Sequence, residues 1–125
     1  MKTLLKASTL KHRTNKLLKK KLDKLWSELV KKRAKGRCEM CGKTTSLNSH
    51  HIISRSNLTL RWDLRNGCCL CCGCHSLSTS SAHKDPLGFA EWVKEHRAAD
   101  YDYLMAKKNE IFDKDYKRIE KELSK

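Results

Sequence analysis

Four short segments decide how this chain folds: Cys38-Glu39-Met40-Cys41, His50-His51, Asn66 and Cys71-Cys72-Gly73-Cys74-His75. Asn66 follows His51 by fifteen residues, and His75 follows Asn66 by nine, with a Cys-x-x-Cys motif directly before it. A chance arrangement seldom keeps all of these intervals together. We therefore interpret the four segments as one connected pattern.

The two Cys-x-x-Cys motifs predict a tetrahedral zinc site. Each motif turns so that two thiolates face one metal ion, and a second motif about thirty residues later completes a four-sulfur site. The predicted ligands of the structural zinc are Cys38, Cys41, Cys71 and Cys74. Buried thiols or disulfide partners are the alternative, but the chain is short and we see no apolar signal segment at its start.

Three further cysteines crowd the second motif. Cys68 with Cys71, or Cys69 with Cys72, would also have two residues between them. We prefer Cys71 with Cys74, because this pair keeps the following histidine in register with the asparagine. The three remaining cysteines are then small core residues or bystanders.

The chain contains the pattern His50-His51-Ile52-Ile53, Asn66 and Leu70-Cys71-x-x-Cys74-His75. This pattern resembles the signature of the HNH nucleases, whose ββα-metal fold also occurs in colicin DNases. The resemblance covers about residues 38–83. Other stretches are similar to small HNH proteins carried by phages and prophages: Leu25-Trp26-Ser27-Glu28, Ser54-Arg55, Arg61-Trp62-Asp63-Leu64 and Phe89-Ala90-Glu91-Trp92.

This resemblance implies roles for three histidines and one asparagine. His51 is the implied general base, since an imidazole with an ordinary pKa of about 6.5 can deprotonate water near neutral pH. His50 and His75 are the implied ligands of a catalytic divalent cation (Mg²⁺, Mn²⁺, Ni²⁺ or Zn²⁺), which would neutralise charge on the phosphate and the departing 3′ oxygen. Asn66 would tie down the loop between two strands and fix the orientation of His51. Successive strand residues face opposite sides, so the two adjacent histidines take different tasks unless the strand bulges.

The pattern leaves the third ligand of the cation open. Colicin-type sites carry it one helical turn after the second ligand, where this chain has Thr79, a poor ligand for a transition ion. His83 lies two turns after His75 and reaches the ion, or a phosphate, only if the helix continues or the chain bends back. In the competing interpretation the histidines form a second structural zinc knuckle, but structural sites are closed by four ligands.

The charge of the chain is unevenly placed along its 125 residues, which carry a formal net charge of +14. Residues 1–37 hold fourteen basic and two acidic side chains, residues 38–83 hold four and two, and residues 84–125 hold ten and ten. A positive segment of this density attracts the phosphate backbone without reading sequence. A solvated basic helix or an expression-related tail is the alternative, and the adjacent phosphodiesterase motif favours nucleic acid.

Hydrophobic periodicity predicts a long helix over about residues 14–35, with leucines on one face and lysines opposite, ended by Gly36. Strands are expected around residues 47–53 and 64–70, joined by an arginine-containing loop. The catalytic helix should begin near Cys74. A further helix should be capped by Asp85 with Pro86 at its first position, and one or two more should follow.

Six basic side chains are predicted to contact DNA. The helix offers lysines away from its leucine face, and the loop offers arginines whose planar forks suit phosphate. They are Lys20, Lys24, Lys31, Arg55, Arg61 and Arg65. Alternatively the lysines meet only water, and the arginines pair with Asp63 or project into solvent. Aromatic residues are few and are not interleaved with the basic run, which argues against a dedicated binder of single strands.

These observations predict an α+β protein with a zinc-stapled ββα-metal (HNH) core, a long N-terminal basic helix and C-terminal helices. We divide it into a basic helical extension (residues 1–37), an HNH module with the zinc site (38–84) and a C-terminal helical extension (85–125), within one compact domain.

The expected function is that of a metal-dependent DNA endonuclease, and the resemblance implies 5′-phosphate and 3′-hydroxyl products. The alternative is a non-catalytic zinc-dependent DNA-binding or regulatory protein on the same scaffold, and RNA is a third option as substrate. We expect DNA as the partner, with phage, recombination or packaging proteins as further candidates. We expect no membrane and a cytoplasmic location, which is the host cytoplasm if a phage encodes the chain.

Overall fold

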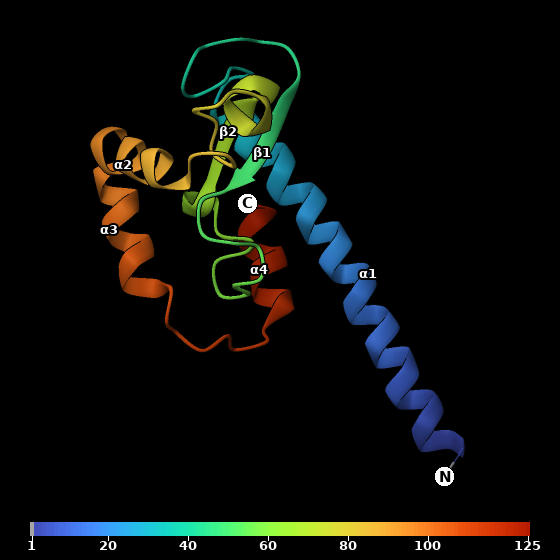
Figure 1. Ribbon diagram of the computed structural model, residues 1–125. Coiled ribbons are helices and arrows are strands. Elements are labelled where there is room, and N and C mark those ends of the chain that lie inside the picture. The colour runs from blue at the N-terminus through green and yellow to red at the C-terminus, as the bar shows by residue number, and fades with distance from the viewer. Residues whose placement is uncertain (1) are drawn as a thin grey trace.

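The computed structural model describes residues 2–125, and the side chains from residue 13 onward (Figure 1). The elements in chain order are helix α1 (Lys2–Arg33), strand β1 (Leu47–His51), the 3-10 turn η1 (Leu64–Asn66), strand β2 (Gly67–Cys71), the π-type turn η2 (Gly73–Leu77), and helices α2 (Pro86–His96), α3 (Ala98–Lys107) and α4 (Tyr116–Leu123). The described chain is therefore a mixed α+β fold with one small sheet.

Helix α1 is longer than the helix predicted over residues 14–35, because its backbone is already helical at Lys2. It ends two residues earlier than predicted, at Arg33. The chain turns there because Lys35 and Gly36 both take the left-handed conformation, with φ of 57° and 68°. The amide of Gly36 then donates to the carbonyl of Lys31 at 3.1 Å, which satisfies one of the free carbonyls of the last turn.

Strands β1 and β2 pair antiparallel, with Leu47 opposite Cys71 and His51 opposite Gly67. Both are shorter than predicted. The first strand stops at His51, and the segment predicted to start the second strand forms η1, where the side chain of Asp63 accepts a hydrogen bond from the amide of Arg65 at 2.9 Å. Every residue of β2 is buried, so this strand lies at the centre of the fold.

The C-terminal helices cover the sheet on two sides. Helix α2 begins as predicted, with Asp85 as its cap and Pro86 as its first residue, and the Asp85 side chain accepts from the amide of Gly88 at 3.1 Å. Helices α2 and α3 lie together on one side, whereas α4 returns to pack against α1 (Figure 1).

Two cores meet at the sheet. One joins the apolar face of α1 to α4, and it contains Leu22, Trp26, Val30, Trp62, Cys69, Ile119 and Leu123. The other joins the cysteine-rich end of the sheet to α2, and it contains Cys38, Cys68, Leu70, Cys71, Ala82, Phe89 and Val93. Strand β2 therefore shares its buried side chains between both cores. Over the part of the chain that the structure describes, no helix is long and apolar enough to cross a membrane.

Candidate functional site

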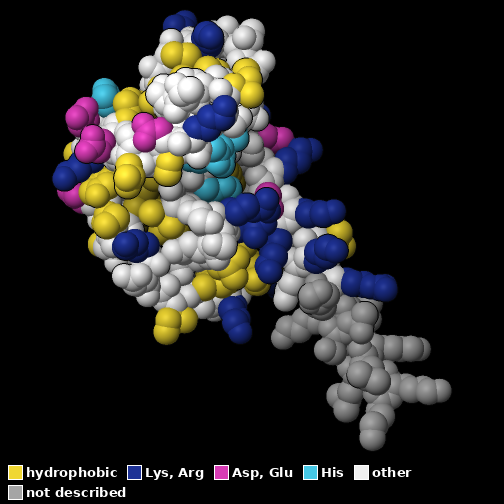
Figure 2. All heavy atoms as spheres, in the orientation of Figure 1, with side chains coloured by type: hydrophobic (Ala, Val, Ile, Leu, Met, Phe, Trp, Pro, Cys, Tyr) yellow, Lys and Arg dark blue, Asp and Glu magenta, His cyan; other side chains and the backbone are white. Residues whose placement is uncertain are grey.

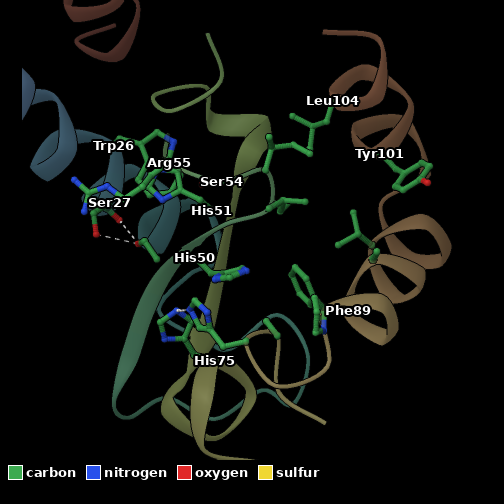
Figure 3. Close-up of a pocket in the computed structure, with 18 of the residues that line it drawn as sticks. Trp26, Ser27, His50, His51, Ser54, Arg55, His75, Phe89, Tyr101 and Leu104 are labelled. Carbon is green, nitrogen blue, oxygen red and sulfur yellow. Dashed lines mark hydrogen bonds between the residues drawn. The ribbon is translucent and has the colours of Figure 1, made fainter. Parts of the chain in front are cut away.

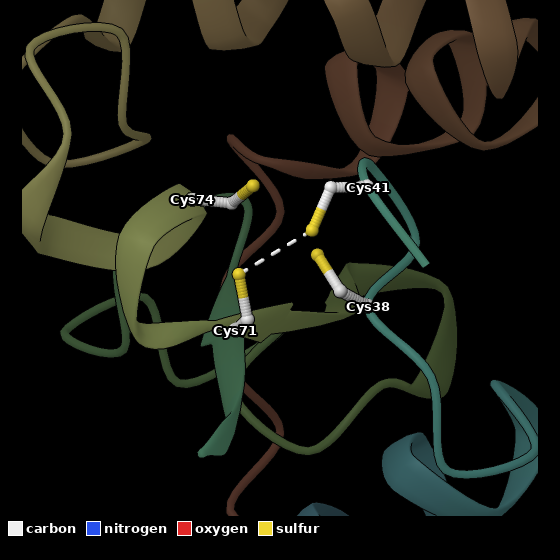
Figure 4. Close-up of side chains that lie close together, drawn as sticks. All are labelled: Cys38, Cys41, Cys71 and Cys74. Carbon is white, nitrogen blue, oxygen red and sulfur yellow. Dashed lines mark hydrogen bonds between the residues drawn. The ribbon is translucent and has the colours of Figure 1, made fainter. Parts of the chain in front are cut away.

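The four cysteines predicted to bind zinc converge on one point (Figure 4). Two come from the turn after α1, one ends β2, and one lies in η2. The sulfur atoms of Cys38, Cys41, Cys71 and Cys74 all lie within 4.8 Å of one another. Four thiols that approach from two separate segments fit a tetrahedral ion, so this cluster can hold a structural metal such as zinc.

Backbone amides prepare two of these thiols to act as thiolates. The amide of Cys74 is the main reason that the pKa of Cys71 is lowered to about 7. Burial acts to raise the pKa of Cys38, but hydrogen bonds from several backbone amides, including that of Cys71, outweigh it and lower this pKa. The thiolate is the form that binds a metal, so both shifts favour the loaded site.

The other three cysteines lie outside this cluster. Cys68 and Cys69 are fully buried, and burial raises the pKa of both thiols. Cys72 is half-buried on the segment between the two ligands of the second motif. Their positions agree with the pairing of Cys71 with Cys74 that the sequence favoured.

Strand alternation turns His50 and His51 to opposite faces of the sheet. His50 faces the rings of His75 and His83, with centroid distances of 5.1 and 5.0 Å. His51 faces α1 instead. No bulge is needed, and the two histidines occupy different environments that both line the same cavity (Figure 3).

His83 reaches His75 because the chain bends back after η2. The turn ends at Leu77, and the returning segment bonds to it, with the amide of His83 donating to the carbonyl of His75 at 3.1 Å. The two Nε2 atoms lie 3.0 Å apart. Thr79, at the position where colicin-type sites carry their third ligand, is an exposed residue of the turn.

The three imidazoles form a second group with metal-ligand geometry. One nitrogen from each of His50, His75 and His83 lies within 4.8 Å of the others. Burial, followed by the proximity of His75 and His83, lowers the pKa of His50 to about 4, and burial followed by His83 lowers that of His75. Histidine binds a metal ion through its neutral imidazole, so these three histidines suit a divalent transition-metal ion or zinc.

His51 is held from two sides. Its ring stacks on the indole of Trp26, with centroids 4.0 Å apart and planes 9° from parallel. Its Nε2 lies 2.9 Å from the carbonyl oxygen of Arg61. A carbonyl only accepts, so Nε2 carries the proton and Nδ1 of the neutral ring keeps its lone pair. Burial lowers the pKa of His51, although the bond to Arg61 opposes this, and the neutral form is favoured.

Asn66 is fully buried and holds the loop that carries the Arg61 carbonyl. Its side-chain oxygen accepts from the amide of Ile53 at 2.7 Å, and its Nδ2 donates to the carbonyls of Ile53 and Leu60 at 3.0 and 3.1 Å. The side chain therefore joins the two ends of the loop. Its side-chain hydrogen bonds go to the loop, so it orients His51 through the loop that carries the Arg61 carbonyl.

Asp23 on α1 fixes the same loop from outside. It accepts from Nε and NH2 of Arg61 at 3.0 and 2.7 Å and from the indole of Trp62 at 2.9 Å. Burial acts to raise the pKa of Asp23, but these hydrogen bonds and the charges of Arg61 and Arg55 lower it. A charged carboxylate on the helix thus anchors the residue whose carbonyl orients His51.

The three arginines predicted to contact DNA differ in their exposure to solvent and in their ion pairs. Arg61 is engaged by Asp23, with its side chain 15% exposed. Arg65 donates to Asp100 at 2.8 Å and lies over the ring of Tyr103, away from the histidines. Arg55 is 62% exposed, lines the cavity and lies 3.4 Å from Asp23. Of the three, the structure brings Arg55 to the cavity with its guanidinium largely open to solvent.

The predicted lysines share one face of α1. Lys20, Lys24 and Lys31 follow at intervals of four and seven residues, which returns them to the same side of a helix. Lys20 and Lys24 are exposed and Lys31 is half-buried. Asp23 and Ser27, which line the cavity, lie beside this face. The lysines therefore flank the histidine cavity, and Figure 2 shows Lys and Arg side chains along α1 next to the histidines.

Two supports of His51 were not predicted from the sequence. Helical periodicity places Trp26 beside the apolar face of α1, but nothing in a single sequence indicates which residue it stacks on. Asp23 is one of only two acidic residues among the first 37, and this isolation was the one available signal. Gly67 makes the contact possible, because a Cβ there would lie 2.3 Å from Val30 and 3.0 Å from Trp26.

Comparison of the chain with protein-family models, curated proteins and solved structures finds no match. What the protein does is therefore inferred from its own residues and their geometry.

Proposed function

We propose that the protein is a metal-dependent DNA endonuclease, built on a zinc-stapled ββα-metal core, that hydrolyses phosphodiester bonds. The observation that carries the proposal is the pairing of two kinds of histidine in one cavity. Three imidazoles can share a divalent cation, and a fourth that lines the same cavity keeps a free nitrogen. The HNH-like spacing of the same residues in the sequence supports this assignment.

The three-histidine group is suited to catalysis rather than to a structural role. A structural zinc is enclosed by four protein ligands, as the cysteine cluster can provide, whereas three ligands leave a position for water or substrate. His75 is half-buried and His83 is exposed, so a phosphate can approach from solvent. A divalent cation bound there supplies electrostatic stabilisation of the charge that develops on the phosphate and the leaving oxygen.

His51 acts as the general base through Nδ1. The proton on Nε2 is retained by the Arg61 carbonyl, so Nδ1 is the nitrogen that can take a proton from water. Stacking on Trp26 restricts rotation of the ring, which keeps this lone pair aimed in one direction. Arg55, exposed on the cavity rim, is the residue best placed to contact a phosphate of the bound strand.

The principal alternative is a non-catalytic zinc-dependent DNA-binding or regulatory protein on this scaffold. Such a protein needs the cysteines and the lysine face, but it has no use for three converging imidazoles or for a fourth held in a single tautomer. Cleavage therefore distinguishes the two functions. The same assay with an RNA duplex and an RNA strand compares the two nucleic acids as substrates.

The test is a nicking assay on supercoiled plasmid with the zinc-loaded protein and Mg²⁺, Mn²⁺, Ni²⁺ or Zn²⁺ added in turn. His51→Ala should lower the cleavage rate by about a hundredfold or more, the usual contribution of a positioned base, while zinc content and DNA affinity stay near wild type. His96→Ala is the matched control, since His96 is an exposed residue of α2 bonded only to its own helix. Cleavage by His51→Ala at the wild-type rate would refute the assignment.

A further inference from the structure

An apolar groove continues from the histidines toward α2 and α3 (Figure 3). The cavity that holds His50, His51, His75 and His83 has a volume of about 850 Å³, which is more than a hydrated cation and a phosphate group fill. Its far part is lined by Ile53, Phe89, Val93, Tyr101, Leu104 and Met105. None of these side chains carries a charge.

The floor of the groove is rigid and its rim is open. Phe89, Val93 and Leu104 are 5%, 0% and 1% exposed, so they belong to the packed interior. Tyr101 is half-buried and Met105 is 42% exposed, and these two lie at the rim. A ligand in the groove would therefore meet Tyr101 and Met105 first, with the buried side chains behind them.

The two sides of the histidine cluster differ in chemistry. On the α1 side lie the exposed side chains of Arg55, Lys20 and Lys24. On the α2 and α3 side lies the apolar groove, and Figure 2 shows hydrophobic side chains there and basic ones along α1, with histidines between them. A matching ligand has anionic groups along one edge and flat, weakly polar groups along the other.

We propose that the groove binds an unpaired nucleobase of the strand that is cut, next to the phosphate held at the histidines. This inference rests on the proposed nuclease function and specifies its substrate. A strand with unstacked bases has the required amphipathic character, since its phosphates can follow the basic side while a base enters the groove. A fully paired duplex has phosphates on its outside and its bases stacked within, so it offers nothing to the groove.

An aromatic ring at the rim gives the base a surface to stack on. Phe89 contacts the ring of His50 at a centroid distance of 5.0 Å, so the groove begins directly beside the metal-ligand group. Phe89 is buried against Trp92 and His50, so Tyr101, half-buried at the rim, is the ring that a base can reach, and Nζ of Lys94 lies 5.9 Å from the centroid of this ring. Stacking on such a ring accepts any base, because every base has a π-face.

The energy of unpairing selects the substrate. Taking a base out of a matched duplex costs a few kcal/mol, and the cost is lowest for a mismatched or single-stranded base. The protein should therefore cut preferentially beside mismatches, bulges, gaps or single-stranded segments, and should cut a matched duplex more slowly.

The experiment compares two oligonucleotide duplexes that differ only in one unpaired nucleotide beside the cut. Single-turnover cleavage should be at least about tenfold faster on the duplex with the unpaired base, because one factor of ten corresponds to about 1.4 kcal/mol of avoided unpairing. Tyr101→Ala should abolish most of this preference, whereas Tyr101→Phe, which keeps the ring, should retain it. Tyr103→Phe is the control, since Tyr103 is on the same helix but outside the groove.

A second readout does not depend on cleavage. With 2-aminopurine at the unpaired position, binding should change its fluorescence, and Tyr101→Ala should reduce the change. Equal cleavage of both duplexes, or a preference that Tyr101→Ala leaves intact, would overturn the groove assignment and leave the nuclease assignment standing. A groove that binds an apolar segment of a partner protein would give this result. No cleavage of either duplex, together with a Tyr101-dependent fluorescence change, would overturn the nuclease and leave the base-binding groove standing.

Discussion

The environment of His51 shows how a single imidazole is given one orientation and one tautomer. The indole of Trp26 limits the ring to one plane, and the carbonyl of Arg61 fixes the protonated nitrogen. In the proposed reaction neither contact supplies charge. The two contacts would keep the ring pointing at the attacking water and would keep its unprotonated nitrogen on that side. Residues that act in this way position the base and do not react themselves.

Trp26→Phe tests this positioning. Phenylalanine keeps an aromatic face for His51 but loses the hydrogen bond from the indole to the carbonyl of Asp63, which is 2.9 Å long. We expect folding to survive and the cleavage rate to fall about three- to tenfold, because one net hydrogen bond is worth about 1 kcal/mol. Trp26→Leu, which removes the face as well, should reduce the rate further at unchanged KM. A rate for Trp26→Leu equal to that of Trp26→Phe would show that stacking has no part in catalysis.

His83 is the proposed third ligand of the catalytic cation, so its removal should change the metal dependence of cleavage. His83→Ala should raise the concentration of divalent ion needed for half-maximal cleavage by about tenfold or more, and high metal should restore part of the activity, as we also expect for His50→Ala and His75→Ala. Thr79→Ala should leave the metal dependence unaltered, because Thr79 is exposed on the turn. The measurement is the cleavage rate of each variant as a function of the Mn²⁺ or Zn²⁺ concentration. Equal metal dependence of wild type and His83→Ala would exclude His83 from the ligand set.

At the scale of elements, the cysteine cluster joins two segments of the chain that are far apart in sequence. The turn at residues 38–43, the end of β2 and the five-residue turn η2 meet there. The sheet has only two strands, and a two-stranded hairpin is marginal in water without further support. A metal ion held by the four thiols would supply the order that a larger sheet gives to another protein.

Removal of zinc should accordingly unfold this region. A strong chelator, or Cys38→Ser, should abolish cooperative unfolding of the sheet as measured by circular dichroism, because folding and metal binding are coupled in small domains. Metal analysis should find one tightly held zinc per chain. Cys72→Ser is the control, since Cys72 lies outside the cluster, and it should keep both zinc and stability. A zinc-free protein that unfolds cooperatively would contradict the four-cysteine site.

Helix and strand boundaries could be predicted from the sequence where neighbouring residues determine them, and could not where distant residues do. The cap of α2 was predicted to the residue, because Asp85 and Pro86 act on their immediate neighbours. The start of β2 was misplaced by three residues, because Leu64–Asn66 directly precedes the strand but is turned by the hydrogen bond from the Arg65 amide to the Asp63 side chain. The return of His83 to His75 depends on backbone bonds eight residues apart in sequence, and no periodic pattern encodes them.

At the scale of the whole molecule, the net charge of +14 is concentrated on the helix that borders the cavity. The lysine face of α1 and the histidines lie on neighbouring surfaces, so a strand that binds along the helix passes the site. This arrangement could be predicted in part, since the leucine face of α1 had to be buried and the lysines therefore had to face out. The pairing of Arg61 and Arg65 with carboxylates could not, because their partners lie 38 and 35 residues away.

Charge removal on α1 should separate binding from chemistry. Neutralising Lys20, Lys24 and Lys31 to Gln should weaken binding to all DNA sequences alike and reduce the salt dependence by roughly one unit of slope for each phosphate that the helix no longer neutralises. Turnover on saturating DNA should change little. The control removes the same charge elsewhere, from the exposed Lys114, Lys117 and Lys121. If both triple variants kept the wild-type affinity and salt slope, binding would have to come from Arg55 and the groove.

The carboxylate of Asp23 has a consequence for how this protein can be divided. It lies on α1, yet it anchors the loop whose carbonyl orients His51, and Trp26 lies one turn further along the same helix. A fragment that starts at the first cysteine motif would keep every metal ligand and lose both supports. Transplanting residues 38–84 into another protein would therefore transfer the ion-binding parts without the alignment of the base, so a working graft must begin upstream of Asp23.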